Sequence, residues 1–206
     1  MNAIAVIGAA GRTGRLVVDE ALARGHRVTA ITRRPGGFAP APGLTVATAD
    51  PTLPSALNGL LDRHDVVISA LGTAGRGPTT LYSDSAAAIL TTMRPGGRLL
   101  VISSAGVSIP SDAGPVTGLF ARLLHRIMHE VYTDMERMER RLAHSELVWT
   151  AVRPTRLTDA PAGHPQISVG AKRKVGPRTA RADLAGYLLD AMDDPRTYRT
   201  SVAISS

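Results

Sequence analysis

The 206-residue chain is predicted to form an α/β fold, in which a doubly wound parallel sheet carries helices on both faces. Segments typical of strands alternate with segments typical of helices along the chain, as successive βαβ units require. The first strand-like segment, residues 3–7, also runs directly into a glycine-spaced turn and a helix. Because no linker or repeat divides the chain, residues 1–206 are expected to form a single domain.

The same alternation assigns each element in turn. Strands are expected near residues 3–7, 27–31, 44–48, 65–70, 98–102, 148–152 and 201–205. Helices are expected near residues 13–24, 54–62, 80–93, 117–144 and 180–192. Proline and glycine make 35–43 and 159–178 irregular stretches. The helix near 117–144 carries an apolar stripe at intervals of three and four residues, which indicates packing on the sheet. Its members are Leu119, Leu123, Ile127, Val131, Met135, Met138 and Leu142.

The turn after the first strand has the glycine spacing of a phosphate-binding loop. Gly8 suits the tight turn that leaves the strand, and Gly11 suits a backbone that pyrophosphate must approach closely. Gly14 suits the point where the helix packs on the sheet. The helix begins near Arg12, so its free N–H groups and positive dipole end would face the phosphates. The motif therefore predicts a nucleotide-dependent enzyme.

In a doubly wound sheet the ligand lies beyond the carboxyl ends of the strands. The second strand is followed by Thr32, Arg33 and Arg34, where an NAD-selective enzyme would carry an acidic residue for the ribose 2′-hydroxyl. The two arginines favour the 2′-phosphate of NADP, although a basic surface turn is the alternative. Residues 50–51 are placed to border the adenine, and residues 69–73 to run along the nicotinamide half.

Composition excludes several classes of protein. The chain is 44% apolar and 20% charged, with no apolar run long enough for a membrane span and no signal peptide, so we expect a cytoplasmic protein. The absence of cysteine excludes disulfides and thiolate metal sites. The net charge of +7 raises the possibility of nucleic-acid binding, but the basic residues are scattered and only 3% of residues are aromatic. An anionic dinucleotide explains the charge more simply.

Further motifs follow the glycine loop in a fixed order. They are Leu71-Gly72-Thr73, Val101-Ile102-Ser103-Ser104-Ala105, Glu139-Arg140-Arg141-Leu142 followed by Ser145-Glu146-Leu147-Val148-Trp149-Thr150, Val152-Arg153-Pro154-Thr155 and Arg181-Ala182-Asp183-Leu184-Ala185. With these motifs nearly the whole chain resembles the atypical short-chain dehydrogenase/reductase superfamily of NAD(P)-binding Rossmann proteins. Within it, the chain is most similar to the branch of flavin reductase/biliverdin-IXβ reductase and its NmrA-like bacterial relatives.

The resemblance implies NADP(H) as the cofactor and assigns residues to its parts. The pyrophosphate would be held by Gly8, Ala10, Gly11, Arg12, Thr13 and Gly14. The 2′-phosphate would be held by Arg33 and Arg34, and the adenine would be flanked by Asp50 and Pro51. The nicotinamide and its ribose would be bordered by Leu71, Gly72, Thr73, Ser103, Pro154 and Thr155. Ser104 falls on the active-site serine of the flavin/biliverdin reductase branch.

The chain departs from the superfamily at its proton donor. Most short-chain dehydrogenases use a Tyr-x-x-x-Lys pair, in which the ammonium group favours the ionised tyrosine. Here Tyr132 is followed four residues later by Glu136, whose carboxylate has the opposite effect. Glu136 therefore favours a packing or substrate-wall role for Tyr132, with a role as proton donor as the alternative. Arg156 stands where the mammalian enzyme has a histidine, and could hold an acidic substrate or the cofactor.

Other polar residues suggest further possibilities. His125 and His129 lie four residues apart and would share one helix face; without a further ligand we expect a surface or substrate-cleft pair and no metal. Ser103 and Ser104 lack an adjacent base, which argues against a hydrolase. Loops 72–80, 104–118 and 154–178 are expected to form the substrate cleft, with the small residues of 106–115 as a lid or wall.

Together these features predict an NADPH-dependent oxidoreductase that delivers hydride to a planar conjugated acceptor such as a flavin, a quinone or an enone. Ser104 would orient the acceptor or the nicotinamide amide, and solvent or a substrate group would supply the proton. Two alternatives stay open: an NADP-binding regulator of the NmrA-like kind without turnover, and a biosynthetic ketoreductase or isomerase that uses Tyr132 or a histidine as acid. The expected partner is a small molecule, and the expected state is a monomer or homodimer.

Overall fold

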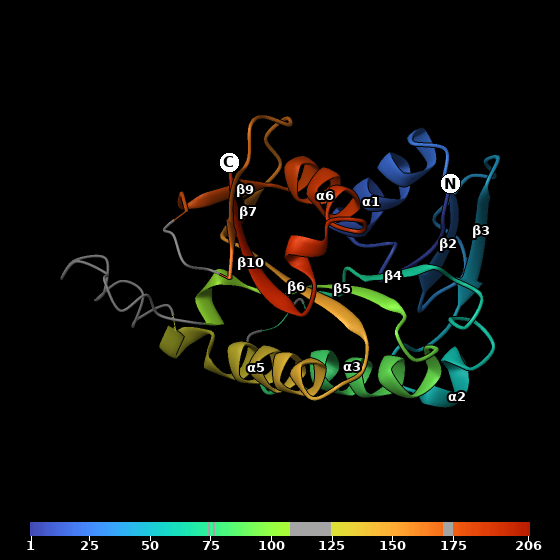
Figure 1. Cartoon of the computed structure of the whole chain (residues 1–206), viewed down its shortest axis with the longest axis horizontal. Helices are drawn as coiled ribbons and strands as arrows, with labels where there is room; N and C mark the ends of the chain where they lie inside the picture. Colours follow the sequence, from blue (N-terminus) through green and yellow to red (C-terminus); the bar gives the residue numbers. More distant parts are fainter. Residues whose placement is uncertain (74, 76, 108–124, 171–174) are drawn as a thin grey trace.

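An eight-stranded sheet forms the centre of the molecule in the computed structural model, which describes residues 1–73, 75, 77–107, 125–170 and 175–206 (Figure 1). In spatial order its strands are β3 (Leu44–Thr48), β2 (Arg27–Thr32), β1 (Ala3–Ile7), β4 (Val66–Ser69), β5 (Arg98–Ile102), β6 (Val148–Pro154), β10 (Thr200–Ser205) and β8 (Gln166–Val169). The first seven are parallel, and β8 is antiparallel to β10. The predicted doubly wound α/β class is confirmed.

Helices cover both faces of the sheet, as Figure 1 shows. On one face lie α3 (Leu81–Thr92) and α5 (His129–Ala143), with the short α2 (Pro54–Leu57) beside them. On the other face lie α1 (Arg12–Ala23) and α6 (Arg181–Asp190), which pack against each other. The remaining elements are the turns η1 (Ala105–Val107) and η2 (Pro195–Thr197) and a separate strand pair of β7 (Arg156–Thr158) and β9 (Arg178–Ala180).

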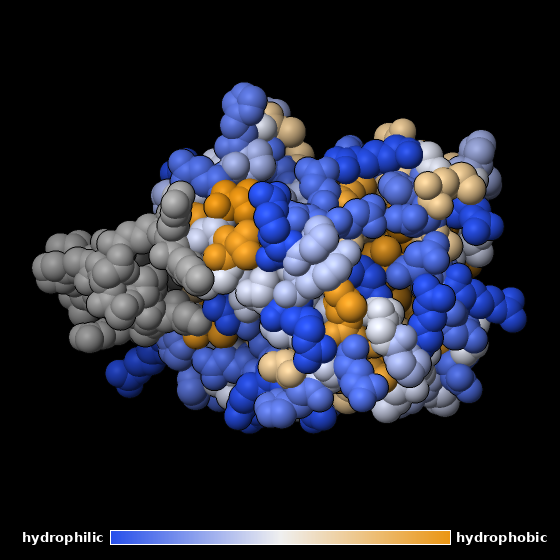
Figure 2. All heavy atoms as spheres, viewed as in Figure 1, coloured by the Kyte–Doolittle hydropathy of each residue, from blue (hydrophilic) through white to orange (hydrophobic). Residues whose placement is uncertain are grey.

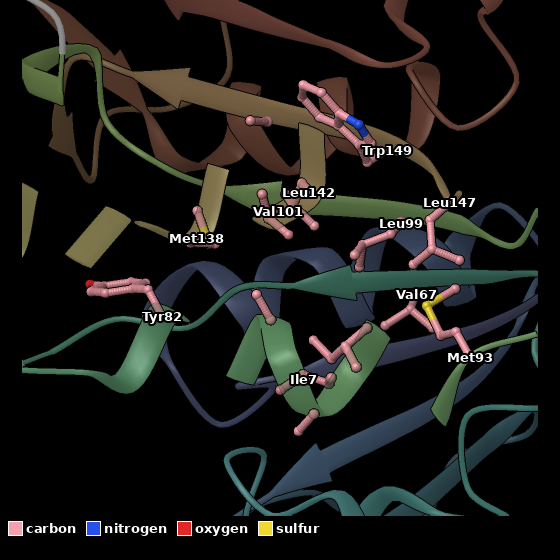
Figure 3. Close-up of a cluster of buried hydrophobic side chains, with 14 of the residues drawn as sticks. Ile7, Val67, Tyr82, Met93, Leu99, Val101, Met138, Leu142, Leu147 and Trp149 are labelled. Atoms are coloured by element: carbon pink, nitrogen blue, oxygen red, sulfur yellow. The ribbon is translucent and has the colours of Figure 1, made fainter. Parts of the chain in front are cut away.

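The core divides into two layers because successive strand residues point to opposite faces. Ile7 of β1 packs in the layer under α3 and α5, whereas the neighbouring Val6 packs under α1 and α6. Figure 3 shows the first layer, in which Met138 and Leu142 of α5 lie over Val101 of β5. Strands buried on both sides explain the nearly continuous apolar runs of the sequence.

The chain order reverses beside β1. From β1 the chain moves outward to β2 and β3, then crosses back to β4 and moves outward in the other direction to β5 and β6. The helices and loops that leave β1 and β4 therefore diverge to opposite sides. Their separation opens a crevice at the carboxyl ends of these strands, which is where doubly wound folds bind ligands.

Three expected elements differ from the structure. Strand β8 lies inside the stretch 159–178 that was expected to be irregular; it is stabilised by antiparallel pairing with β10, in which Val169 faces Val202. Helix α2 ends at Leu57 rather than near residue 62. In the expected helix near 117–144 the structure shows helical residues 125–127, a turn at Met128 and then α5, which ends at Ala143. Residues 117–124 and most of the expected lid, 108–115, lie outside the described residues.

Arg98 is an unusual member of the core. It is only 8% exposed and lies at the start of β5. Its guanidinium donates to the carbonyl oxygens of Ala191 (2.6 Å), Met192 (2.9 Å) and Val148 (3.0 Å) and to the hydroxyl of Thr150 (2.8 Å). Burial lowers the pKa of Arg98 to about 10. This side chain therefore ties the end of α6 to strands β5 and β6.

Polar side chains cover most of the face drawn in Figure 2, and apolar ones appear there in small separate groups. Large apolar residues that are exposed include Val46 (42%), Ile167 (37%) and Val169 (38%), which lie on the outer strands β3 and β8. Within the described residues, no helix is long and apolar enough to cross a membrane.

Candidate functional site

A cleft of about 760 Å³ opens at the carboxyl ends of the central strands. It lies at the reversal of chain order described above, and its volume is within the usual range for a small-molecule site. Its lining consists of Ile7, Gly8, Ala10, Gly11, Arg12, Thr13, Ile31, Thr32, Arg33, Arg34, Ala49, Pro51, Ala70, Leu71, Gly72, Thr73, Tyr82, Ile102, Ser103, Met135, Leu157 and Arg181.

The glycine loop between β1 and α1 forms the floor of the cleft, and its geometry explains the glycines. Gly8 has φ +76°, and a Cβ there would lie 2.8 Å from the carbonyl oxygen of Ala70. A Cβ on Gly14 would overlap the carbonyl oxygen of Gly8, because α1 packs directly on the loop. Gly11 is the N-cap of α1 and supplies no side-chain cap. The loop can thus bring bare backbone and a helix N-terminus to an anionic ligand.

The second wall of the cleft follows β2. Thr32 donates a hydrogen bond of 2.7 Å to the carbonyl oxygen of Arg34, which fixes the turn, and the side chains of Arg33 and Arg34 are exposed beside it. Asp50 faces this turn from the end of β3. Hydrogen bonds from the backbone and hydroxyl of Thr52, with a smaller contribution from the charge of Arg33, hold the pKa of Asp50 below its usual range. Asp50 is therefore ionised at neutral pH and partly offsets the arginine charge.

The opposite half of the cleft is largely apolar. Its walls are formed by Leu71 from the loop after β4, Ile102 of β5, Met135 of α5 and Leu157 of β7. Ser103 lies among them and donates a hydrogen bond of 2.6 Å to Glu139 of α5. A planar, uncharged ring would lose little solvation on entering such a pocket.

Glu139 is held in turn by Arg153 on β6. The Nε atom of Arg153 donates to Glu139 over 3.0 Å, and a second guanidinium nitrogen pairs with the other carboxylate oxygen. The two side chains are only 11% and 15% exposed. This bidentate pair fixes the carboxylate that accepts the hydrogen bond from Ser103.

Tyr82 lines the cleft although its sequence context did not point to a site. It lies in the first turn of α3 and is 4% exposed, and its hydroxyl oxygen accepts a hydrogen bond of 3.2 Å from the backbone N–H of Thr73. Its position just after the β4 loop, at the carboxyl edge of the sheet, was the available signal. Met135 was predicted only as a member of the core stripe.

Three charged residues lie at the mouth of the cleft. Asp159, which follows β7, pairs with Arg12 of the glycine loop and with Arg181 at the start of α6, the latter over 2.7 Å. Arg12 and Arg181 both line the cleft. Asp183, one turn into α6, accepts a hydrogen bond of 2.8 Å from the backbone of Gly163 and so holds the loop beside the mouth. Asp159 and Arg181 were not among the predicted site residues.

Most of the residues assigned to the cofactor line this cleft. Those that line it are Gly8, Ala10, Gly11, Arg12, Thr13, Thr32, Arg33, Arg34, Pro51, Leu71, Gly72, Thr73 and Ser103. Those outside the lining are Gly14, Asp50, Pro154 and Thr155. Gly14 lies under the loop, and Thr155 is turned toward Thr179, with 2.9 Å between their hydroxyl oxygens.

The candidate catalytic and substrate residues lie elsewhere. The hydroxyl oxygen of Ser104 accepts a hydrogen bond of 3.1 Å from the backbone of Gly106. Tyr132 is 7% exposed, and its ring lies against Gly106 and 5.6 Å from the ring of His125. The ring of His129 lies 6.1 Å from the ring of His125. Arg156 is exposed on β7. Among the described residues, no group of three histidine and acidic side chains could hold a metal ion.

Comparisons with known proteins agree with this geometry. The fold and the cleft define a nucleotide-binding protein of the Rossmann type. Residues 8–195 match the model of the NAD(P)H-binding family, so the chain belongs to that family.

Solved structures share the fold along the whole chain. A short-chain dehydrogenase/reductase of Veillonella parvula DSM 2008 in complex with NADP is 19% identical with a TM-score of 0.78, covering 100% of this chain and 95% of the other. A Streptococcus pneumoniae TIGR4 protein named "putative NADH-flavin reductase" is 22% identical with a TM-score of 0.76, and all of both chains is covered. An oxidoreductase of Lactococcus lactis is 15% identical with a TM-score of 0.77, covering 99% and 90%.

Proposed function

We propose that this NAD(P)H-binding protein is an NADPH-dependent reductase of planar conjugated acceptors such as quinones, flavins or enones. The observation that carries the proposal is the cleft itself, which joins a glycine cradle and two exposed arginines at one end to apolar walls at the other. The relation to flavin reductases and NmrA-like proteins in the sequence agrees with it. So does the complex of the Veillonella parvula relative with NADP.

The residues of the cradle fit a dinucleotide. Gly8, Gly11 and the start of α1 would hold the pyrophosphate, because a Cβ at Gly8 would push the loop away from the backbone of Ala70 and the helix N-terminus attracts anions. Arg33 and Arg34 would pair with the 2′-phosphate, a contact that NADH cannot make. When bound there, NADPH would supply a hydride to the ring held against it.

The apolar half would orient the acceptor. Leu71 and Met135 would sandwich a flat ring and exclude water from it, which favours hydride transfer over side reactions. The hydroxyl of Ser103 would accept hydrogen bonds, since its own proton is directed to Glu139. Ser104 and Tyr132 would act from the adjoining surface at η1 and α5 as parts of the substrate wall. The cytoplasmic location and the monomeric or dimeric state stay predictions of the sequence.

Titration of purified protein with NADPH and NADH, followed by nicotinamide fluorescence, tests the cofactor. Addition of FMN, a quinone or an enone, followed by absorbance at the nicotinamide band, tests turnover. Tight NADPH binding with acceptor-dependent oxidation is the expected result. Tight binding without oxidation by any acceptor would contradict the reductase and favour an NADP-binding regulator. Equal affinity for NADH and NADPH would contradict the role of Arg33 and Arg34.

A further inference from the structure

Tyr82 lines the cleft and carries a polar group, its hydroxyl, beside the backbone of Thr73. The tyrosine ring packs at one end of the core cluster, and its hydroxyl points away from that cluster (Figure 3). The residue is 4% exposed and lines the cleft together with Ser103 and Met135. A phenol in this position can contact whatever occupies that half of the cleft.

Tyr82 is also rigidly placed. Asp134 of α5, which has no exposed surface, accepts a hydrogen bond of 2.8 Å from the backbone N–H of Tyr82 and another from the hydroxyl of Ser83. This carboxylate satisfies one of the free backbone donors at the start of α3, whose N-cap residue makes no side-chain cap. The neighbouring Met135 extends from the same helix into the cleft. The buried carboxylate of Asp134 therefore anchors Tyr82 and lies next to Met135, which forms one apolar wall.

The proton of the Tyr82 hydroxyl is available for a ligand. Burial raises the pKa of Tyr82, and the charge of Asp134 adds to that increase against the opposing effect of the Thr73 amide, so the phenol stays protonated at neutral pH. Its oxygen accepts from the backbone N–H of Thr73, which leaves the O–H to donate. Within the described part of the chain, no acceptor for this O–H is found. By contrast, Ser103 already donates to Glu139.

Resting on the function proposed above, we propose that Tyr82 is a catalytic residue that donates a hydrogen bond to the carbonyl oxygen of the acceptor. When hydride from the nicotinamide reaches a quinone or enone, the electron pair moves to that oxygen, and a donor fixed beforehand stabilises the growing negative charge. Tyr82 keeps its proton, and water supplies the proton that converts the resulting anion into the neutral product. The acceptor is accordingly a neutral conjugated carbonyl compound, and Tyr82 acts on it as a hydrogen-bond donor, not as the proton donor that a Tyr-x-x-x-Lys pair supplies.

The variant Tyr82→Phe tests this assignment, because it keeps the ring and removes only the hydroxyl. With 2-methyl-1,4-naphthoquinone as acceptor, kcat should fall about 100-fold, as expected for the loss of one preorganised donor. The dissociation constant for NADPH should change by less than about twofold. Tyr187→Phe, on the half-buried face of α6, is the matched control and should leave both values unchanged. An unchanged kcat in Tyr82→Phe would overturn the assignment, as would a loss of NADPH affinity as large as the loss of kcat.

A second measurement tests the hydrogen bond from Tyr82 to the acceptor carbonyl without requiring turnover. In the complex of the protein with NADP⁺ and the same naphthoquinone, the infrared carbonyl stretch should lie at lower frequency in the wild type than in Tyr82→Phe. A role confined to holding the Thr73 loop would not move this band, so identical frequencies would overturn the inference. If the wild type shifts the band but oxidises no NADPH, the proposed reductase function fails while the contact of Tyr82 stands. A wild type that binds no naphthoquinone would overturn both.

Discussion

Ser103 at the end of β5 donates its hydroxyl proton to Glu139 of α5 over 2.6 Å, and so joins the cleft to the buried pair of Glu139 and Arg153. The Glu139 carboxylate orients Ser103 and also balances the charge of Arg153, whose side chain is only 15% exposed. Removing its charge leaves Arg153 with one charged partner fewer in a poorly solvated place.

Glu139→Gln should therefore lower the free energy of unfolding by about 3 kcal/mol, the scale expected when one partner of a poorly solvated ion pair is removed. Urea unfolding followed by circular dichroism measures the change. The exposed Glu146→Gln is the matched control and should stay within about 0.5 kcal/mol of the wild type. A loss below about 1 kcal/mol at Glu139 would show that water solvates the pair after all.

Gly8 in the glycine loop can be compared with Gly25 after α1, which has nearly the same φ. Gly8 and Gly25 have φ +76° and +78°, but a Cβ meets the carbonyl oxygen of Ala70 only at Gly8 and finds nothing within 4 Å at Gly25. Gly25→Ala should lose about 1–2 kcal/mol of stability from backbone strain. Gly8→Ala should lose more, because its Cβ also meets the backbone of Ala70. Only Gly8→Ala should also weaken NADPH binding, by more than about tenfold (1.4 kcal/mol). Equal NADPH affinity in the two variants, measured by fluorescence titration, would contradict the cradle.

Replacement of both Arg33 and Arg34 by alanine should raise the dissociation constant for NADPH by about 10- to 100-fold, because two charge-assisted contacts to the 2′-phosphate are lost. The value for NADH should hardly change. Arg27→Ala is the control, since Arg27 is exposed on the same strand but at its opposite end. If NADH affinity fell in parallel with NADPH affinity, the arginines would contact a part that both dinucleotides share.

His64 predicts that stability depends on pH. Burial lowers the pKa of His64 below its ordinary value of 6.5, with the charges of Asp62 and Asp65 acting against the shift, and its Nε2 lies 2.8 Å from the hydroxyl of Thr29. Below pH 6.5 the unfolded chain takes up a proton more readily than the folded one, so the free energy of unfolding should fall as the pH drops through this range. His64→Gln should remove this part of the pH dependence, whereas the exposed His144→Gln should retain it. The measurement is the urea midpoint of each variant from pH 7.5 to pH 5. If the midpoint changed with pH to the same extent in both variants, His64 would be excluded as the cause.

Arg98 predicts a larger effect on stability. Arg98→Met keeps an unbranched side chain without the guanidinium and leaves the carbonyl oxygens of Ala191 and Met192 without this donor. The free energy of unfolding should fall by about 3–5 kcal/mol, since several buried acceptors lose a partner at once. Arg98→Lys should recover part of the loss, because an ammonium group still donates. Thermal unfolding of the three proteins provides the comparison, and equal midpoints for the two variants would contradict a role based on hydrogen bonds.

Local patterns were sufficient to predict the sheet and the glycine loop, because Gly8, Gly11 and Gly14 act within one turn of chain and the buried strands are apolar throughout. Residues placed by distant contacts could not be predicted in this way. Tyr82 enters the cleft because α3 is tied to Asp134 on α5, a contact between residues 52 positions apart. Strand β8 likewise depends on its pairing with β10, which its own proline- and glycine-rich surroundings do not reveal.

The cleft is assembled from segments that are far apart in the chain, from Ile7 to Arg181, and Asp159 joins two of them at its mouth. A partly made or partly unfolded chain therefore has no complete binding site, so a dinucleotide would bind the native state alone. At a ligand concentration of 100 times its dissociation constant, this preference adds about 2.7 kcal/mol to the stability of the native state. The abundance of intact protein in a cell would then follow the supply of its nucleotide, because proteases degrade the unfolded chains that no ligand has captured.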